Sequence, residues 1–184
     1  PSTPYAASKA AADLLLFTYA RNFDFPLVVV RATNVYGAGQ QIFKIVPKAI
    51  IAVKSGRTLE LHGGGQAIKS YIHVRDVSQG ELSVMLHGRN GEVYHLSPEK
   101  GVAVREFVKL ICQRMQADWG KVVKEVDERL GQDNRYVIDS SKVRGELGWQ
   151  PRISLEEGID DVIRWIEGYW DRIQLLSHEY SHRL

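Results

Sequence analysis

A tyrosine and a lysine stand four residues apart near the start of the sequence, as Tyr5 and Lys9. On a helix this spacing puts the two side chains on one face as neighbours. A free tyrosine loses its proton only at strongly alkaline pH, and a nearby cation favours the phenolate. A phenol in this setting can take the proton of a hydroxyl group while hydride leaves the same carbon. Because such pairs also occur by chance on solvated helix faces, the rest of the chain must decide between the two interpretations.

The segments that carry and follow this pair have the pattern of an α/β fold. Residues 5–21 are rich in alanine and leucine and contain neither glycine nor proline, which predicts a helix. Residues 27–30 read Leu-Val-Val-Val, and such a continuous apolar run is typical of a strand covered on both faces of a parallel sheet. A helix, a short link and a buried strand in this order indicate an α/β architecture.

The rest of the chain alternates further helices and strands without a repeat or an obvious linker. We therefore expect one compact unit or two tightly interwoven ones. Asp76 and Ser154 are residue types that favour helix N-caps. The predicted elements are a helix over 42–54, strands over 59–62 and 69–74, a helix from Asp76 to His87, a strand over 92–96, a helix over 104–115, an extended piece over 136–138, a helix over 140–148, and a last long helix that begins at Ser154 and carries Trp165 and Trp170.

Composition narrows the classes of partner. The formal net charge of +2 over 184 residues provides no global field for nucleic acid or an anionic membrane. No apolar run approaches the ~20 residues that a membrane span needs. The single cysteine, Cys112, excludes an internal disulfide and a four-cysteine zinc site. With no basic or apolar leader at its start, the sequence predicts a cytoplasmic protein without nucleic-acid or membrane partners.

Seven sequence blocks, in order and at consistent spacing, resemble the extended short-chain dehydrogenase/reductases of the NAD-dependent epimerase/dehydratase family. Within that family the chain is most similar to the dTDP-glucose 4,6-dehydratases. The resemblance implies a Rossmann-like α/β fold, with residues 1–40 as the remainder of the dinucleotide-binding domain and 41–184 mainly as a smaller mixed substrate-binding region. The blocks are 3–9 (TPYAASK), 31–37 (RATNVYG), 44–47 (KIVP), 61–66 (LHGGGQ), 69–76 (KSYIHVRD), 135–139 (RYVID) and 146–151 (ELGWQP).

The resemblance also implies roles at the cofactor. Tyr5 would be the catalytic base and Lys9 would bind the nicotinamide ribose, so both would contact NAD. NADP stays open, because the residues that choose between the two cofactors are not found in this chain. Neither G-x-x-G-x-x-G nor G-x-G-x-x-G occurs, although a dinucleotide site needs such a glycine-rich turn. We therefore expect the chain to lack the dinucleotide-binding half of its parent enzyme and to be inactive alone.

Five further residues would contact a nucleoside-diphosphate sugar. In the family, the position of Asn34 meets the sugar-phosphate part of the substrate, and that of His62 lies near the nucleotide base. Lys69 replaces an arginine that grips the diphosphate, and lysine lacks its bidentate fork. A turn role for Asn34, a strand-end role for His62 and surface solvation for the cations are the competing interpretations. The predicted substrate residues are Asn34, Lys44, His62, Lys69 and Arg129.

The reaction implied is that of a lyase of carbohydrate biosynthesis, an NAD-dependent nucleotide-sugar 4,6-dehydratase. A nucleotide-sugar epimerase, a decarboxylase or a reductase shares these motifs, and a non-catalytic nucleotide-sugar-binding fragment is a further alternative. Ala38, His95 and Ala103 depart from the dehydratase pattern and leave the sugar nucleotide open.

The resemblance also implies that the full-length protein is a homodimer that packs the helix of Tyr5 and Lys9 against its copy. Ala10, Leu14 and Phe17 form an apolar stripe that would serve this contact, or else would pack on the sheet. One further pattern has no part in the resemblance. Residues 178–182 spell H-E-x-x-H, the pattern of zinc proteases. Because this motif stands two residues from the last one, we interpret it as a polar tail and expect no metal.

Overall fold

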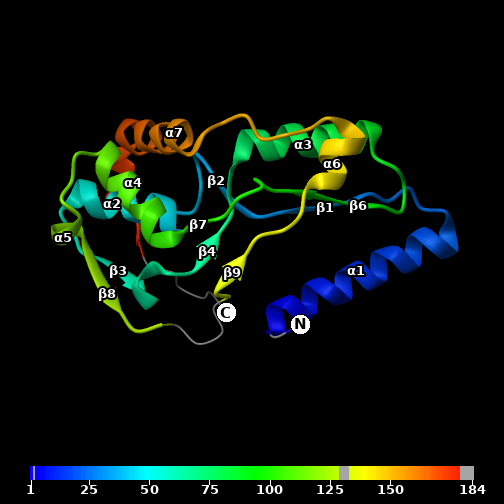
Figure 1. Ribbon diagram of the computed structural model, residues 1–184, viewed down its shortest axis with the longest axis horizontal. Helices are drawn as coiled ribbons and strands as arrows, with labels where there is room; N and C mark the ends of the chain where they lie inside the picture. Colours follow the sequence, from blue (N-terminus) through cyan, green and yellow to red (C-terminus); the bar gives the residue numbers. More distant parts are fainter. Residues whose placement is uncertain (2, 129–132, 179–184) are drawn as a thin grey trace.

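The computed structural model describes residues 1, 3–128 and 133–178 of the chain, and the elements divide between two hydrophobic cores. The first core surrounds a parallel pair of strands, β1 (Val29–Ala32) and β6 (Val93–Leu96), in register from Val29 opposite Val93. Figure 1 shows α3 (Val74–His87) and α6 (Ser141–Leu147) on one side of this pair and α1 (Pro4–Phe23) on the other. This parallel pair between helices confirms the predicted α/β class.

The second core is formed by three helices, α2 (Ile45–Ser55), α4 (Val104–Arg114) and α7 (Leu155–Gly168). Beside them β3 (Leu59–His62) pairs in parallel with β8 (Val123–Val126). A small sheet places β4 (Ile68–Lys69) between β7 (Val102–Ala103) and β9 (Arg135–Tyr136). The short elements η1 (Gly63–Gly65), α5 (Trp119–Val122) and α8 (Trp170–Ile173) complete this part (Figure 1).

The two cores meet at a parallel pair, β2 (Asn34–Tyr36) and β5 (Tyr71–His73). Val35 packs against the first core, whereas its neighbour Tyr36 is buried in the second. Successive residues of a strand face opposite sides, so this pair presents one face to each core. The predicted single strand over 69–74 is therefore two strands, because the chain changes partners at Ser70. The predicted division of the chain at residue 40 stays a prediction.

Asp76 is not the N-cap that its sequence position suggests. His73 occupies that position, where its Nδ1 accepts from the Arg75 backbone N–H at 3.3 Å. The buried Asp76 carboxylate instead accepts from the backbone N–H groups of Arg152 and Ile153, at 3.1 and 3.0 Å. Asp76 thus connects the first turn of α3 to the segment that leads into α7, and a buried charge needs such partners.

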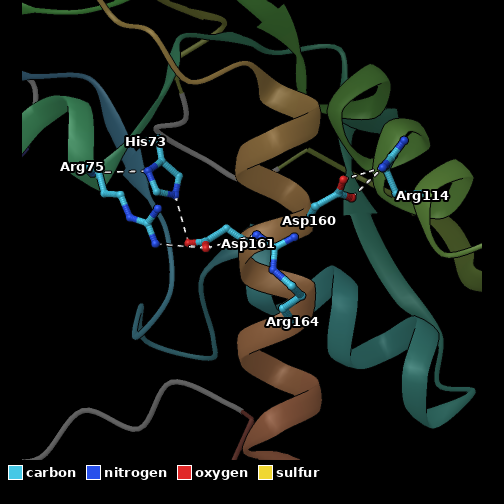
Figure 2. A network of polar contacts seen from close by, with 6 residues as sticks. All are labelled: His73, Arg75, Arg114, Asp160, Asp161 and Arg164. Carbon is cyan, nitrogen blue, oxygen red and sulfur yellow. Dashed lines mark hydrogen bonds and ion pairs between the residues drawn. The ribbon is translucent and has the colours of Figure 1, made fainter.

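Helix α7 is fixed on both sides by ionic contacts. Figure 2 shows Asp160 pointing to Arg114 on α4, where both carboxylate oxygens accept hydrogen bonds from the guanidinium. On the other side, Asp161 lies 3.4 Å from the His73 ring and 3.2 Å from the Arg75 guanidinium (Figure 2). The helix therefore joins β5 and α3 to α4 through adjacent carboxylates.

Helix α1 is attached more loosely than the other long helices. None of its described residues is buried, and Leu14 of the predicted dimer stripe is 72% exposed. The Asp13 carboxylate accepts from the Arg31 guanidinium on β1, which is the ion pair that joins α1 to the sheet among the described residues. None of the described helices is long and apolar enough to span a membrane.

The N-cap predicted for Ser154 is confirmed, and it forms a reciprocal capping box. The Ser154 hydroxyl accepts from the Glu157 N–H, and the Glu157 carboxylate accepts from the Ser154 N–H at 2.9 Å. The long helix ends at Gly168, so Trp165 lies on it as predicted but Trp170 begins α8.

The capping box predicts a pH-dependent effect on stability. The Ser154 N–H bond to its carboxylate lowers the pKa of Glu157 from the ordinary 4.5. A carboxylate with a lowered folded pKa stabilises the fold above its unfolded pKa, and this contribution is lost as the pH falls through the folded value. We expect Glu157→Ala to lower Tm at pH 7, with the difference from wild type vanishing in acid.

Glu167→Ala is the matched control for this measurement, because Glu167 is an exposed residue of the same helix. Thermal unfolding of the three proteins between pH 7 and pH 3 checks the prediction. A Tm difference that stays constant across this range would contradict the assigned role of the Glu157 carboxylate.

Candidate active site

A cavity of about 1250 Å³ opens where the two cores meet. It is bordered by the first turn of α1, strand β2, the loop and first turns of α2, strand β3, and one face of the β4–β5 segment. Five of the predicted site residues line it: Tyr5, Asn34, Lys44, His62 and Lys69. These five residues, up to 64 positions apart in the sequence, are thus collected around one cavity.

Tyr5 enters the cavity wall from the N-terminal end of α1. The Thr3 hydroxyl caps this helix by accepting from the Ala6 N–H at 3.1 Å, and Pro4 begins the helix, where proline is favoured. Tyr5 is 74% exposed, so its phenol is accessible to a ligand. Lys9 lies one turn further along α1 and is exposed, outside the cavity lining formed by the described residues.

Asn34 is oriented by the pairing of β2 with β5. Its backbone N–H and its Nδ2 both donate to the Ser70 carbonyl oxygen, each at 3.1 Å. With one Nδ2 hydrogen used in this way, the side-chain oxygen and the second Nδ2 hydrogen remain for a ligand. Gln40 supplies a second amide to the wall, because its Nε2 donates to the Val35 carbonyl oxygen at 2.7 Å.

Three lysines give the cavity a positive wall. Lys44 stands at the N-cap of α2 without forming a side-chain cap, and its Nζ lies 5.7 Å from the Phe43 ring centroid. Lys48 follows one turn later on the same helix, and Lys69 comes from β4. The uncapped N–H groups of a helix N-terminus add to such a field and favour an anion.

Strand β3 closes the cavity with one basic and one acidic side chain. Leu59 and Leu61 are buried in the second core, so Glu60 and His62 face the other side of the strand. The His62 ring is fixed by a 3.0 Å contact between its Nδ1 and the Asp127 carbonyl oxygen on the neighbouring segment. Gly65 turns the chain after β3 at φ +67°. A Cβ at this position would lie 2.8 Å from the backbone nitrogen of Arg105, so the turn requires glycine.

Two other tyrosines beside the cavity are structural. Burial raises the pKa of Tyr36 and of Tyr71 far above the usual value, so both stay protonated. Their rings pack against each other and on Phe107, with centroids 4.2 Å apart for Tyr71 and Phe107. Gly158 on α7 makes room for Tyr36, because a Cβ there would lie 2.2 Å from the phenol oxygen. Of the lining tyrosines, Tyr5 is therefore the one accessible for proton transfer.

Two predictions concern residues outside the described ranges. Arg129 lies outside them, and so does most of the H-E-x-x-H segment. His178, the first residue of that segment, lines the cavity and lies 3.1 Å from the Arg57 guanidinium. Among the residues that the structure describes, no group of histidine, cysteine and carboxylate side chains could hold a metal ion.

Sequence reasoning missed six polar lining residues, which are Thr33, Gln40, Gln41, Lys48, Glu60 and His178. Two of them carried a usable signal. Lys48 follows Lys44 at helical spacing, and Glu60 precedes His62 at strand spacing, so each shares a face with a predicted residue. A cavity with an accessible phenol, three side-chain amides and three lysines suits a polar, anionic ligand that is oxidised or deprotonated at one end.

The model of one family matches residues 1–162, and its description is GDP-mannose 4,6-dehydratase. The chain belongs to this family of nucleotide-sugar dehydratases. The resemblance inferred from the seven blocks is thereby confirmed.

Individual relatives point to the same class of enzyme. A dTDP-glucose 4,6-dehydratase from Haemophilus influenzae is 34% identical over 175 residues, which are 90% of this chain and 52% of that protein. A trifunctional UDP-glucose 4,6-dehydratase, epimerase and reductase from Arabidopsis thaliana is 35% identical over 90% of this chain and 24% of its own length. The crystal structure of a dTDP-glucose 4,6-dehydratase from Streptomyces venezuelae, with NAD bound, has a TM-score of 0.85 at 34% identity. It is matched over 91% of this chain and 52% of its own, so the chain spans about half of that enzyme.

The position of Asn34 leads to a prediction on stability. In Asn34→Asp a carboxylate oxygen replaces the amide donor beside the Ser70 carbonyl oxygen, which removes a hydrogen bond and places two acceptors in contact. We expect a loss of about 1–3 kcal/mol in the free energy of unfolding, measured by urea denaturation. Asn90→Asp, in an exposed turn, is the control and should stay near wild type. Equal stabilities for both variants would show that the Asn34 amide does not hold β2 to β5.

Proposed function

We propose that this chain forms the substrate-binding side of an NAD-dependent nucleotide-sugar 4,6-dehydratase. The observation that carries the proposal is the single cavity that brings the phenol of Tyr5, the amide of Asn34 and three lysines together. A nucleoside-diphosphate sugar needs these three groups: a base at the sugar, a polar contact beside it, and cations along the diphosphate. The family membership and the dehydratase relatives support the same reaction.

The residues present fit one end of a bound NAD. Tyr5 and Lys9 are spaced one turn apart at the start of α1, and the exposed Lys9 ammonium has three donors for the hydroxyls of the nicotinamide ribose. When bound, NAD would take hydride from the substrate and give it back later in the cycle. The crystal structure of the Streptomyces venezuelae relative contains NAD, which supports this cofactor rather than NADP.

In the proposed reaction Tyr5 acts on the hydroxyl at sugar C4. The phenolate takes the hydroxyl proton as hydride leaves C4, which gives the 4-keto sugar. The C5 proton then leaves together with the C6 hydroxyl as water, and the return of hydride to C6 with a proton to C5 gives a 4-keto-6-deoxy sugar. The wall next to Tyr5 contributes the Asn34 amide oxygen, which can accept from a sugar hydroxyl and hold C4 toward the phenol.

The diphosphate would lie along the lysines. Lys44 and the uncapped N-terminus of α2 face it from one side, and Lys69 on β4 faces it from another. A lysine ammonium is a point charge and lacks the bidentate geometry of an arginine guanidinium. Several lysines together would therefore take the place of one bidentate arginine at the diphosphate. We place the complete enzyme in the cytoplasm, and we propose that it is a homodimer joined through the exposed apolar residues of α1.

The lysines provide the test of the proposal. We expect UDP, dTDP or GDP to bind this chain, with Lys44→Gln and Lys69→Gln each weakening the affinity about tenfold, or about 1.4 kcal/mol. Isothermal titration calorimetry with each nucleotide measures the change. A ligand at about 100 times its Kd should also stabilise the fold by about 2.7 kcal/mol.

Lys121→Gln is the matched control, because Lys121 is exposed on α5 and outside the cavity. It should bind every nucleotide as wild type does. If no nucleotide binds, or if the control loses as much affinity as the cavity variants, the proposed function is wrong.

A further inference from the structure

The face that α1 turns toward the sheet carries a charge at its centre. Five residues at helical spacing are half-buried, whereas the other residues of this helix are exposed. Three of the five are alanines and one is a phenylalanine, so the aspartate among them is the member that can form a directed polar contact. The five are Ala6, Ala10, Asp13, Phe17 and Ala20.

Strand β1 provides the opposite charge on the side where α1 lies. Val30 and Ala32 pack against the first core, so the residue between them, Arg31, faces the other side of the sheet, toward α1 (Figure 1). The Arg31 guanidinium lies 2.5 Å from the Asp13 carboxylate. Because 31% of the Asp13 side chain is exposed, solvent screens this contact less than it screens an ion pair on the open surface.

The ion pair lies between two groups that the proposed reaction brings together. Tyr5 stands eight residues before Asp13, which is about 12 Å along the helix axis. Asn34 stands three residues after Arg31, at the start of β2. The connection from the phenol to the amide therefore runs through a helix segment, this ion pair and a short stretch of chain. A shift of Asp13 relative to Arg31 would change the separation of Tyr5 and Asn34.

Packing alone does little to hold the first half of α1. None of the described residues of this helix is buried, and the Thr3 cap belongs to the same end of the chain as Tyr5. Burial of apolar surface is what usually fixes a helix on a sheet. A directed contact between α1 and β1 therefore has a large share in fixing where the phenol lies.

Resting on the proposed function, we infer that Asp13 and Arg31 are positioning residues that align Tyr5 with the sugar through their ion pair. Neither side chain belongs to the described lining of the cavity, so both act through α1 and β1 and not on the ligand. The lysines that would hold the diphosphate come from α2 and β4, which this pair does not contact. The ion pair therefore affects the binding of the sugar and leaves the binding of the nucleoside diphosphate unchanged.

The test measures the gain in affinity that the sugar provides. Calorimetry on this chain compares dTDP-glucose with dTDP, UDP-glucose with UDP, and GDP-mannose with GDP. We expect Asp13→Asn and Arg31→Gln each to lower the gain about threefold, with the affinity for the nucleoside diphosphate within about twofold of wild type. Arg31→Lys keeps the charge and should keep most of the gain.

A double-variant comparison separates alignment of the phenol from a general role in stability. Tyr5→Phe should itself lower the gain from the sugar. Adding Asp13→Asn to Tyr5→Phe should have no further effect, because the phenol oxygen through which the pair acts is then absent. A purely structural role for the ion pair predicts the same loss with and without the Tyr5 hydroxyl.

Arg21→Gln is the control, because it removes a charge from an exposed position of the same helix, and it should keep the wild-type gain. The inference is overturned by an unchanged gain in Asp13→Asn and Arg31→Gln, by equal losses with and without the Tyr5 hydroxyl, by a parallel loss of nucleoside-diphosphate affinity, or by the absence of any gain from the sugar in wild type. In each of these cases nucleotide binding that depends on the cavity lysines leaves the proposed function standing. Failure of every nucleotide to bind would overturn both together.

Discussion

The buried carboxylate of Asp76 is the contact on which the relation between the two cores depends. A charge with 6% exposure is stable only when it is fully bonded, and here the backbone N–H groups of Arg152 and Ile153 supply the bonds. The carbonyl oxygen of the same residue accepts from the Trp149 indole at 3.1 Å. One residue of α3 thereby fixes the link between α6 and α7, and with it the position at which α7 begins.

The position of α7 in turn shapes the candidate site. Gly158 leaves space for the Tyr36 phenol, and Asp161 approaches the His73 ring, so both strands of the β2–β5 pair pack against this helix. Asn34 is two residue pairs away from these contacts on the same strands. Asp76 does not line the cavity, but it fixes the position of α7, against which the strands of the cavity wall pack. One buried carboxylate therefore helps to hold together elements that come from most of the chain.

The sequence predicted those features of the fold that depend on residues close together in the chain. Ser154 and Glu157 form a capping box that can be found from four consecutive residues, and the alternation in β3 and the apolar run before Arg31 give their strands directly. Asp76 was misassigned because its partners are 76 and 77 residues away. The split at Ser70 was missed for the same reason: Lys69 pairs with Val102 and Tyr136, whereas Tyr71 pairs with Asn34, and no local signal marks that change of partner. Among the lining residues, Glu60 has the sequence setting of any exposed strand glutamate, and only the fold brings it into the same cavity lining as the lysines.

The loose attachment of α1 has a mechanical consequence for Tyr5. A helix of 20 residues is about 30 Å long, and Tyr5 lies at the end opposite to Asp24, where the chain turns toward β1. The helix is therefore a lever, and a tilt of about 10° at its base moves the phenol by about 5 Å. Proton transfer tolerates errors of well under that distance. In the proposed reaction, the alignment of Tyr5 would therefore depend on whatever packs along the apolar flank of α1 and restricts its tilt, at residues far from the substrate.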